Sequence, residues 1–197
     1  LPSGARGVFA FSPNRRGMSY VPSQCHLGAP GQGIVKVIDD IALTAKTITG
    51  PGLTAASWTY APGPANDSFS VDCASGCGAT RTTLITKPDG SYVRSTFSNR
   101  RGATEGGLLA SNVYAASGEL KSSTTFGYEY AQFANFDVGY PPPMAGDQGA
   151  AVRRALKSRI TSRDGVTFPW QALSYDGFAR PLSVTRSSST GATMTEA

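Results

Sequence analysis

Histidine is almost absent from this chain of 197 residues, which contains only His26. A catalytic site of the Ser-His-Asp or Cys-His type would have to use that residue. In an extended chain the neighbouring Cys25 points to the opposite side, so the two side chains cannot form an ion pair. The sequence also lacks a phosphate-binding loop, a dinucleotide fingerprint and a calcium loop. We therefore predict that the chain is not an enzyme and binds no cofactor.

Long hydrophobic runs are also missing. No segment approaches the ~20 apolar residues that span a bilayer, so we predict no transmembrane segment. The chain begins at Leu1 and shows no charged region followed by an apolar signal region. We interpret it as an internal piece of a longer protein, or as one whose secretion signal has been removed.

Charge is sparse and slightly positive, with charged residues at 16% and a formal net charge of +5. This balance permits contact with acidic partners. The basic clusters are small pairs at residues 15–16, 100–101 and 153–154, and no recognition helix or RNA-binding signature surrounds them. We interpret the charge as spread over the surface and predict no specific binding of nucleic acid.

Turn residues are abundant, with 23 glycines and 13 prolines, while hydrophobic residues make up 40%. This composition is too apolar for a disordered chain and too rich in turn residues for a helical bundle. Short alternating segments flank glycine turns, of which Asp89-Gly90 and Asp164-Gly165 carry the strongest hairpin signal. We predict an all-β fold in which successive antiparallel hairpins extend one twisted sheet. The predicted turn formers are Gly90, Gly118, Gly165 and Gly177.

Two regions differ in how clearly they show strands. Residues 1–52 form a loop-rich N-terminal segment, in which we predict short strands at 8–11 and 18–21. Residues 34–49 match both a helical stripe and an alternating strand, and the β-branched residues favour strands. Residues 53–197 form a hairpin region that we predict to be one continuous structural unit.

The segment Tyr175-Asp176-x-x-Ala179-Arg180 is similar to the tyrosine-aspartate (YD) repeat of Rhs and wall-associated bacterial proteins. The usual form of that repeat is Y-D-x-x-G-R followed by a strand, so Ala179 stands in place of the glycine. Residues 57–60, 88–90, 97–102 and 104–109 also resemble Rhs segments. Together the resemblance covers residues 53–196.

The resemblance implies a large β-sheet that spirals into a hollow shell enclosing a polymorphic C-terminal toxin, in a protein that is secreted or displayed on the bacterial cell surface for competition. The partners implied are the remainder of the same shell or an enclosed polypeptide. In that family an Asp-Pro signature serves release of the toxin, and this chain contains no Asp-Pro dipeptide. We therefore expect a non-catalytic structural segment of the shell.

Three cysteines leave two interpretations open. Cys25, Cys73 and Cys77 with His26 could form a tetrahedral zinc set, although adjacent ligands at 25 and 26 are unusual. In an exported β protein a disulfide is favoured, with one thiol left over. A bond between Cys73 and Cys77 would close the turn between them, but the sequence does not fix the pairing.

Two other functions remain as alternatives. Trp58 and Trp170 with the tyrosines could form a sugar-stacking platform in a cell-surface adhesion or glycan-binding module, although aromatic residues in strands more often pack with each other. Open strand edges would also allow self-association as a self-assembling surface subunit.

Overall fold

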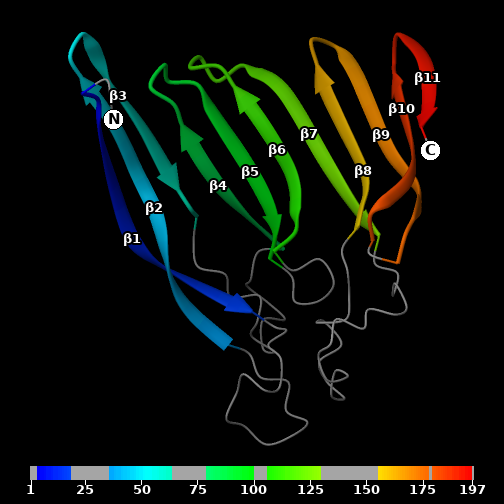
Figure 1. Cartoon of the computed structure of the whole chain (residues 1–197), viewed down its shortest axis with the longest axis horizontal. Helices are drawn as coiled ribbons and strands as arrows, with labels where there is room; N and C mark the ends of the chain where they lie inside the picture. The colour runs from blue at the N-terminus through cyan, green and yellow to red at the C-terminus, as the bar shows by residue number, and fades with distance from the viewer. Residues whose placement is uncertain are drawn as a thin grey trace, which may run out of the picture.

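Each strand of this protein pairs with the strand that follows it in the sequence. The computed structural model describes residues 4–18, 36–63, 79–99, 106–129, 155–177 and 179–196. Within these residues an 11-stranded antiparallel sheet runs from β1 to β11 without a crossover (Figure 1). The predicted all-β fold is confirmed. The strands are β1 (Arg6–Met18), β2 (Lys36–Gly50), β3 (Leu53–Ala61), β4 (Thr80–Thr86), β5 (Tyr92–Ser98), β6 (Leu108–Tyr114), β7 (Leu120–Glu129), β8 (Ala155–Arg163), β9 (Val166–Tyr175), β10 (Pro181–Ser188) and β11 (Gly191–Glu196).

The first strands are longer than the short strands that we predicted near the N-terminus. β1 has 13 residues and β2 has 15, and the two pair along their length. β1 contains Pro13, which lies between the two short strands that the sequence predicts at 8–11 and 18–21. β1 lies at the edge of the described sheet, and an edge strand tolerates a proline because one side of its backbone needs no ladder hydrogen bond. The predicted strand at 18–21 lies outside the described residues except for Met18.

The segment at 34–49 is a strand over its described residues, as the β-branched composition favoured. β2 and β3 form a hairpin through Pro51 and Gly52, so the sheet continues across residue 52. The division of the chain into two regions at that residue stays a prediction.

Three tight turns share one hydrogen-bonding pattern, at residues 87–91, 115–119 and 176–180. In each turn the first N–H donates to the fifth carbonyl, and the fourth N–H donates to the first carbonyl, with N···O distances of 2.8 to 3.0 Å. The fourth residue has a positive φ in every case: 80° at Gly90, 86° at Gly118 and 61° at Ala179. A turn that ends on a left-handed residue is a common hairpin connection. Recurrence of this turn sets the register of three hairpins.

The turn between β8 and β9 has a different backbone conformation. Asp164 and Gly165 have φ values of 51° and 77°. Positive φ at both central residues is typical of a type I′ turn, whose twist matches that of the flanking strands. The four hairpins predicted around Gly90, Gly118, Gly165 and Gly177 are therefore all present. Gly177, however, has no positive φ, and Ala179 takes the left-handed position in its turn.

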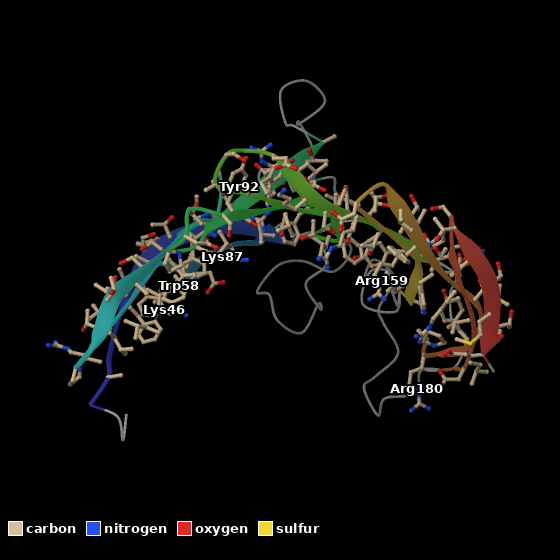
Figure 2. The ribbon with its side chains drawn as sticks, turned by 90° about the horizontal axis from the view of Figure 1, so that it is seen from above. Lys46, Trp58, Lys87, Tyr92, Arg159 and Arg180 are labelled. Atoms are coloured by element: carbon tan, nitrogen blue, oxygen red, sulfur yellow. The ribbon has the colours of Figure 1, made fainter. Side chains whose placement is uncertain are left out.

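The sheet curves, so that it has a concave and a convex face. Figure 2 shows Lys46, Trp58 and Arg159 on the concave side and Tyr92 on the convex side. Residues directly opposite each other in a ladder share a face, and residues along a strand alternate. The register between strands then assigns the paired residues of β2 to β11 to one face or the other.

The described residues form a single layer with almost no hydrophobic core. The only buried hydrophobic residues among them are Ala155 and Ala172, and none of their large side chains is fully buried. Large apolar groups are instead exposed, for example Phe168 at 46% and Met194 at 55%. Stable β domains normally bury one sheet face against a second layer. Cohesion within the described part therefore depends on the ladder and on cross-strand pairs.

Substitution of the left-handed glycines should weaken the hairpins to different degrees. We expect Gly118→Val to lower the free energy of unfolding by about 1–2 kcal/mol because a side chain is strained at positive φ. Gly90→Val should cost more, because its Cβ would also lie 3.0 Å from the Ala116 Cβ, whereas nothing lies within 4 Å at Gly118. Urea unfolding followed by circular dichroism measures both. Gly177→Ala is the control and should change little; an equal loss in all three variants would contradict the turn assignment.

Candidate functional site

The YD-like motif forms a self-contained turn between β9 and β10. The Asp176 carboxylate accepts a hydrogen bond from the Arg180 backbone N–H at 2.9 Å and from Arg180 Nε at 2.6 Å. The Asp176 side chain is 18% exposed and that of Arg180 is 73% exposed. The structure thus brings two of the three predicted motif residues together. Their contacts stabilise the turn and place no pair of catalytic groups there.

Ala179 occupies the left-handed position of this turn with a φ of 61°. An L-residue with a Cβ is disfavoured in that conformation by about 1–2 kcal/mol, whereas glycine adopts it without that penalty. The position is the one at which the YD repeat carries glycine. Contacts of Asp176 on both sides of Ala179 hold the strained backbone in place.

Replacement of Ala179 by glycine should therefore stabilise the protein. We expect Ala179→Gly to raise the free energy of unfolding by about 0.5–1 kcal/mol, since relief of the left-handed strain exceeds the added entropy of the unfolded chain. Thermal and urea unfolding of the two chains measure the difference. Gly118→Ala is the reverse exchange at an equivalent position and should destabilise; a loss of stability in Ala179→Gly would contradict the proposed strain.

The third motif residue, Tyr175, makes a contact away from the turn. Its hydroxyl donates a hydrogen bond of 2.9 Å to the Leu156 carbonyl on β8. Tyr128 makes the same type of contact, donating to the Leu108 carbonyl at 2.8 Å from β7 to β6. In both hairpins a tyrosine near the end of the second strand binds a leucine carbonyl near the start of the first. Sequence reasoning missed this recurrence because it depends on the register between strands.

Partial burial raises the pKa of Tyr175 above its ordinary value, and the negative charge of Glu129 adds to the effect. A raised pKa in the folded state favours the neutral hydroxyl. The contribution to stability is therefore complete below the unfolded pKa and is lost as the pH rises through the folded pKa. The pH range over which this stability is lost therefore lies above 10.0, the ordinary pKa of tyrosine.

Removal of the Tyr175 hydroxyl should affect both stability and its pH dependence. We expect Tyr175→Phe to lower the free energy of unfolding by about 0.5–1.5 kcal/mol at pH 8, because the Leu156 carbonyl loses its donor. The variant should also lose less stability than the parent chain between pH 9.5 and 11. Urea unfolding across that range tests both effects. Parallel alkaline profiles for the two chains would show that Tyr175 does not titrate with unfolding.

The concave face carries most of the large aromatic side chains of the described strands. Lys46 Nζ lies 3.9 Å from the centre of the Trp58 ring, and the two residues are directly opposite on β2 and β3. Further along, Phe126 on β7 and Trp170 on β9 are both directly opposite Arg159 on β8. Cations and aromatic rings therefore alternate across neighbouring strands, an arrangement that permits cation–π attraction.

Charge on the concave face is predominantly positive. The register places these charged side chains on it: Lys46, Arg81, Arg159, Arg163, Arg186 and Glu196. Arg186 Nη2 lies 3.2 Å from Glu196 Oε2, and Arg163 Nε lies 3.3 Å from Asp164 Oδ2. Within the described strands, neither Lys46 nor Arg159 pairs with a carboxylate. The interpretation of charge as merely spread out is therefore too simple, because the register gathers cations on one face.

The convex face is more polar. Hydroxyl and amide groups bond across its strands, as between Thr47 and Ser57 at 3.0 Å and from Ser123 to Asn112 at 2.7 Å. Its main aromatic feature is the stacked pair Tyr92 and Tyr114, whose ring centroids are 4.7 Å apart. The convex face also exposes apolar side chains, such as Val8 at 52% and Ile160 at 41%. What distinguishes the concave face is the alternation of cations with aromatic rings across its strands. The concave face is the stronger candidate for binding.

The predicted cysteine site cannot be placed on the sheet. Cys25, Cys73 and Cys77 and the single histidine, His26, lie outside the described residues. Among the residues that the structure describes, no group of three or more His, Cys, Asp or Glu side chains could hold a metal ion. The described part also contains no helix of the length and apolar character needed to cross a membrane.

Comparison of the chain with protein-family models, with characterised proteins and with solved structures found no match. The concave face and the YD-like turn are therefore the two features from which we infer a function.

Proposed function

We propose that this chain is a non-catalytic segment of a curved β shell of the YD-repeat type, in which the concave face encloses a polypeptide. The observation that carries the proposal is the single-layer sheet with exposed apolar and aromatic groups on its concave side. Burial of such groups is worth about 25 cal/mol per Å², so an occupant of that face would gain free energy. The chain would act in a secreted or surface-displayed bacterial protein that delivers the enclosed polypeptide.

The topology supports growth of the sheet beyond the described strands. β1 and β11 each pair on one side only within the described residues. An unpaired edge offers backbone donors and acceptors to a further strand. The remainder of the same shell would satisfy these groups and would continue the curvature. Pairing with a second copy of the chain would use the same edges and is the route to self-association.

The YD-like turn supports the same proposal. Asp176 and Arg180 bond to each other across a turn whose left-handed position falls where the repeat has glycine. The roles of all three motif residues are therefore structural, as expected for a repeat that builds a sheet. A glycan-binding module is less well supported at Trp58, because Lys46 covers one face of that ring.

Two matched substitutions on neighbouring strands test the role of the concave face. Phe168 on β9 is 46% exposed on the concave face, and Ile160 on β8 is 41% exposed on the convex face. The probe is reduced, carbamidomethylated α-lactalbumin, which cannot refold. We expect the full chain to bind it, and Phe168→Ser to weaken binding by on the order of tenfold, because a buried Phe contributes about 1.5–3 kcal/mol.

Fluorescence anisotropy of the labelled probe gives the dissociation constant, with circular dichroism to check that each variant keeps its sheet. Ile160→Ser should bind as the parent chain does. Equal weakening by both substitutions would show that binding does not use the concave face. Absence of binding to the parent chain would overturn enclosure of a polypeptide.

A further inference from the structure

A row of side chains crosses the concave face from β7 to β11. It consists of Phe126, Arg159, Trp170, Arg186 and Met194, each directly opposite the next in the ladder. We call this set the transverse row. Its aromatic rings are half-buried and its arginines are exposed. An aromatic ring therefore lies between two exposed guanidinium groups.

The two arginines differ in their partners. Arg186 forms an exposed ion pair with Glu196 at 3.2 Å, with side-chain exposures of 56% and 43%. Exposed pairs of this kind are weak and exchange readily with other carboxylates. Arg159 has no ion pair among the described residues. The row therefore has an excess of positive charge that nothing in the described sheet neutralises.

The spacing of the row suits an extended ligand that lies across the strands. Neighbouring strands are about 4.8 Å apart, so the backbones that carry Arg159 and Arg186 are about 10 Å apart with Trp170 between them. Guanidinium groups bind carboxylates in a bidentate manner. Phe126, Trp170 and Met194 offer apolar contact to side chains that flank those carboxylates.

A polypeptide fits this chemistry better than a polysaccharide does. An acidic peptide can alternate carboxylates with apolar side chains, and so match both components of the row. A charged sugar polymer could stack a C–H face on Trp170, but it has no apolar side chains to pack against Phe126 and Met194 at the same time. The apolar members of the row thus favour the polypeptide.

We propose that the transverse row binds an acidic segment of the enclosed polypeptide, with Arg159 and Arg186 contacting carboxylates and Trp170 packing between them. This inference rests on the proposed function and specifies the chemistry of the occupant. The convex face is a poorer match, because Arg94 there lies 5.4 Å from the centre of the Tyr114 ring and no convex ring of the described strands lies between two arginines.

The test uses three labelled synthetic peptides of equal length, with the repeats Glu-Ala-Glu-Phe, Gln-Ala-Gln-Phe and Lys-Ala-Lys-Phe, and sodium polygalacturonate as an acidic polysaccharide. We expect the full chain to bind the glutamate peptide most tightly, and binding to weaken as salt is raised from 50 to 500 mM. Arg159→Gln should weaken binding of that peptide by about tenfold, since a charge-assisted hydrogen bond is lost. Arg94→Gln on the convex face is the matched control and should leave it unchanged.

The outcomes separate this inference from the proposed function. If the glutamine peptide binds as tightly as the glutamate peptide, and Phe168→Ser weakens both, enclosure of a polypeptide stands and acidic selectivity is overturned. Equal effects of Arg159→Gln and Arg94→Gln would overturn the assignment to the transverse row. Binding of polygalacturonate with none of the peptides would overturn both proposals in favour of a glycan. Tight, salt-sensitive binding of the glutamate peptide that Arg159→Gln alone weakens supports the inference.

Discussion

The hydrogen-bonded ladder between consecutive strands is the interaction on which this structure depends. Every strand of the described sheet contacts its neighbours in sequence, and no described helix or second sheet supports it. The tight turns therefore have two effects. They connect the strands, and they fix the register that decides which side chains lie opposite each other. A slip of one residue at the 87–91 or 115–119 turn would move every side chain of the following strand to the opposite face.

Among the described residues the sheet is a single layer, and none of them forms the second layer that normally covers a sheet face. The two faces differ in the side chains that they present. On the convex side, hydroxyl and amide groups bond across strands and the Tyr92 and Tyr114 rings stack. On the concave side, aromatic rings and cations alternate, and Phe168 remains largely exposed. This difference in chemistry, together with the curvature seen in Figure 2, is the basis for proposing that the concave face binds the ligand.

The YD-like turn shows how a short motif can connect two strands through contacts between its own residues and with a neighbouring strand. Asp176 accepts hydrogen bonds from the backbone and side chain of Arg180, and Tyr175 binds the preceding strand. These contacts connect the turn to two strands at once. They also hold Ala179 in a conformation that glycine adopts more easily. The motif therefore stabilises a strand connection, which agrees with the proposal of a repeat-built shell.

Local signals in the sequence determined the fold class and the principal hairpins, because alternation and turn glycines act over a few residues. Asp89-Gly90 and Asp164-Gly165 adopt the left-handed conformations that their turns require. The same signals predict only short strands at 8–11 and 18–21, whereas β1 continues through Pro13. The position of β1 at the edge of the described sheet makes that proline compatible with a strand. The local signals also predict Gly177 as a turn former, whereas the left-handed residue of that turn is Ala179.

The candidate site could not be derived in this way. Phe126, Arg159, Trp170 and Arg186 are distributed over 61 positions of the sequence, from 126 to 186, and no local pattern relates them. Their alignment follows from the register of three strand pairs, and their accessibility follows from the curvature of the sheet. The sequence by itself determined the strands and turns, since these depend on backbone preferences of adjacent residues. Only the tertiary structure decided which cations and rings share a face, because register accumulates from turn to turn across the whole sheet.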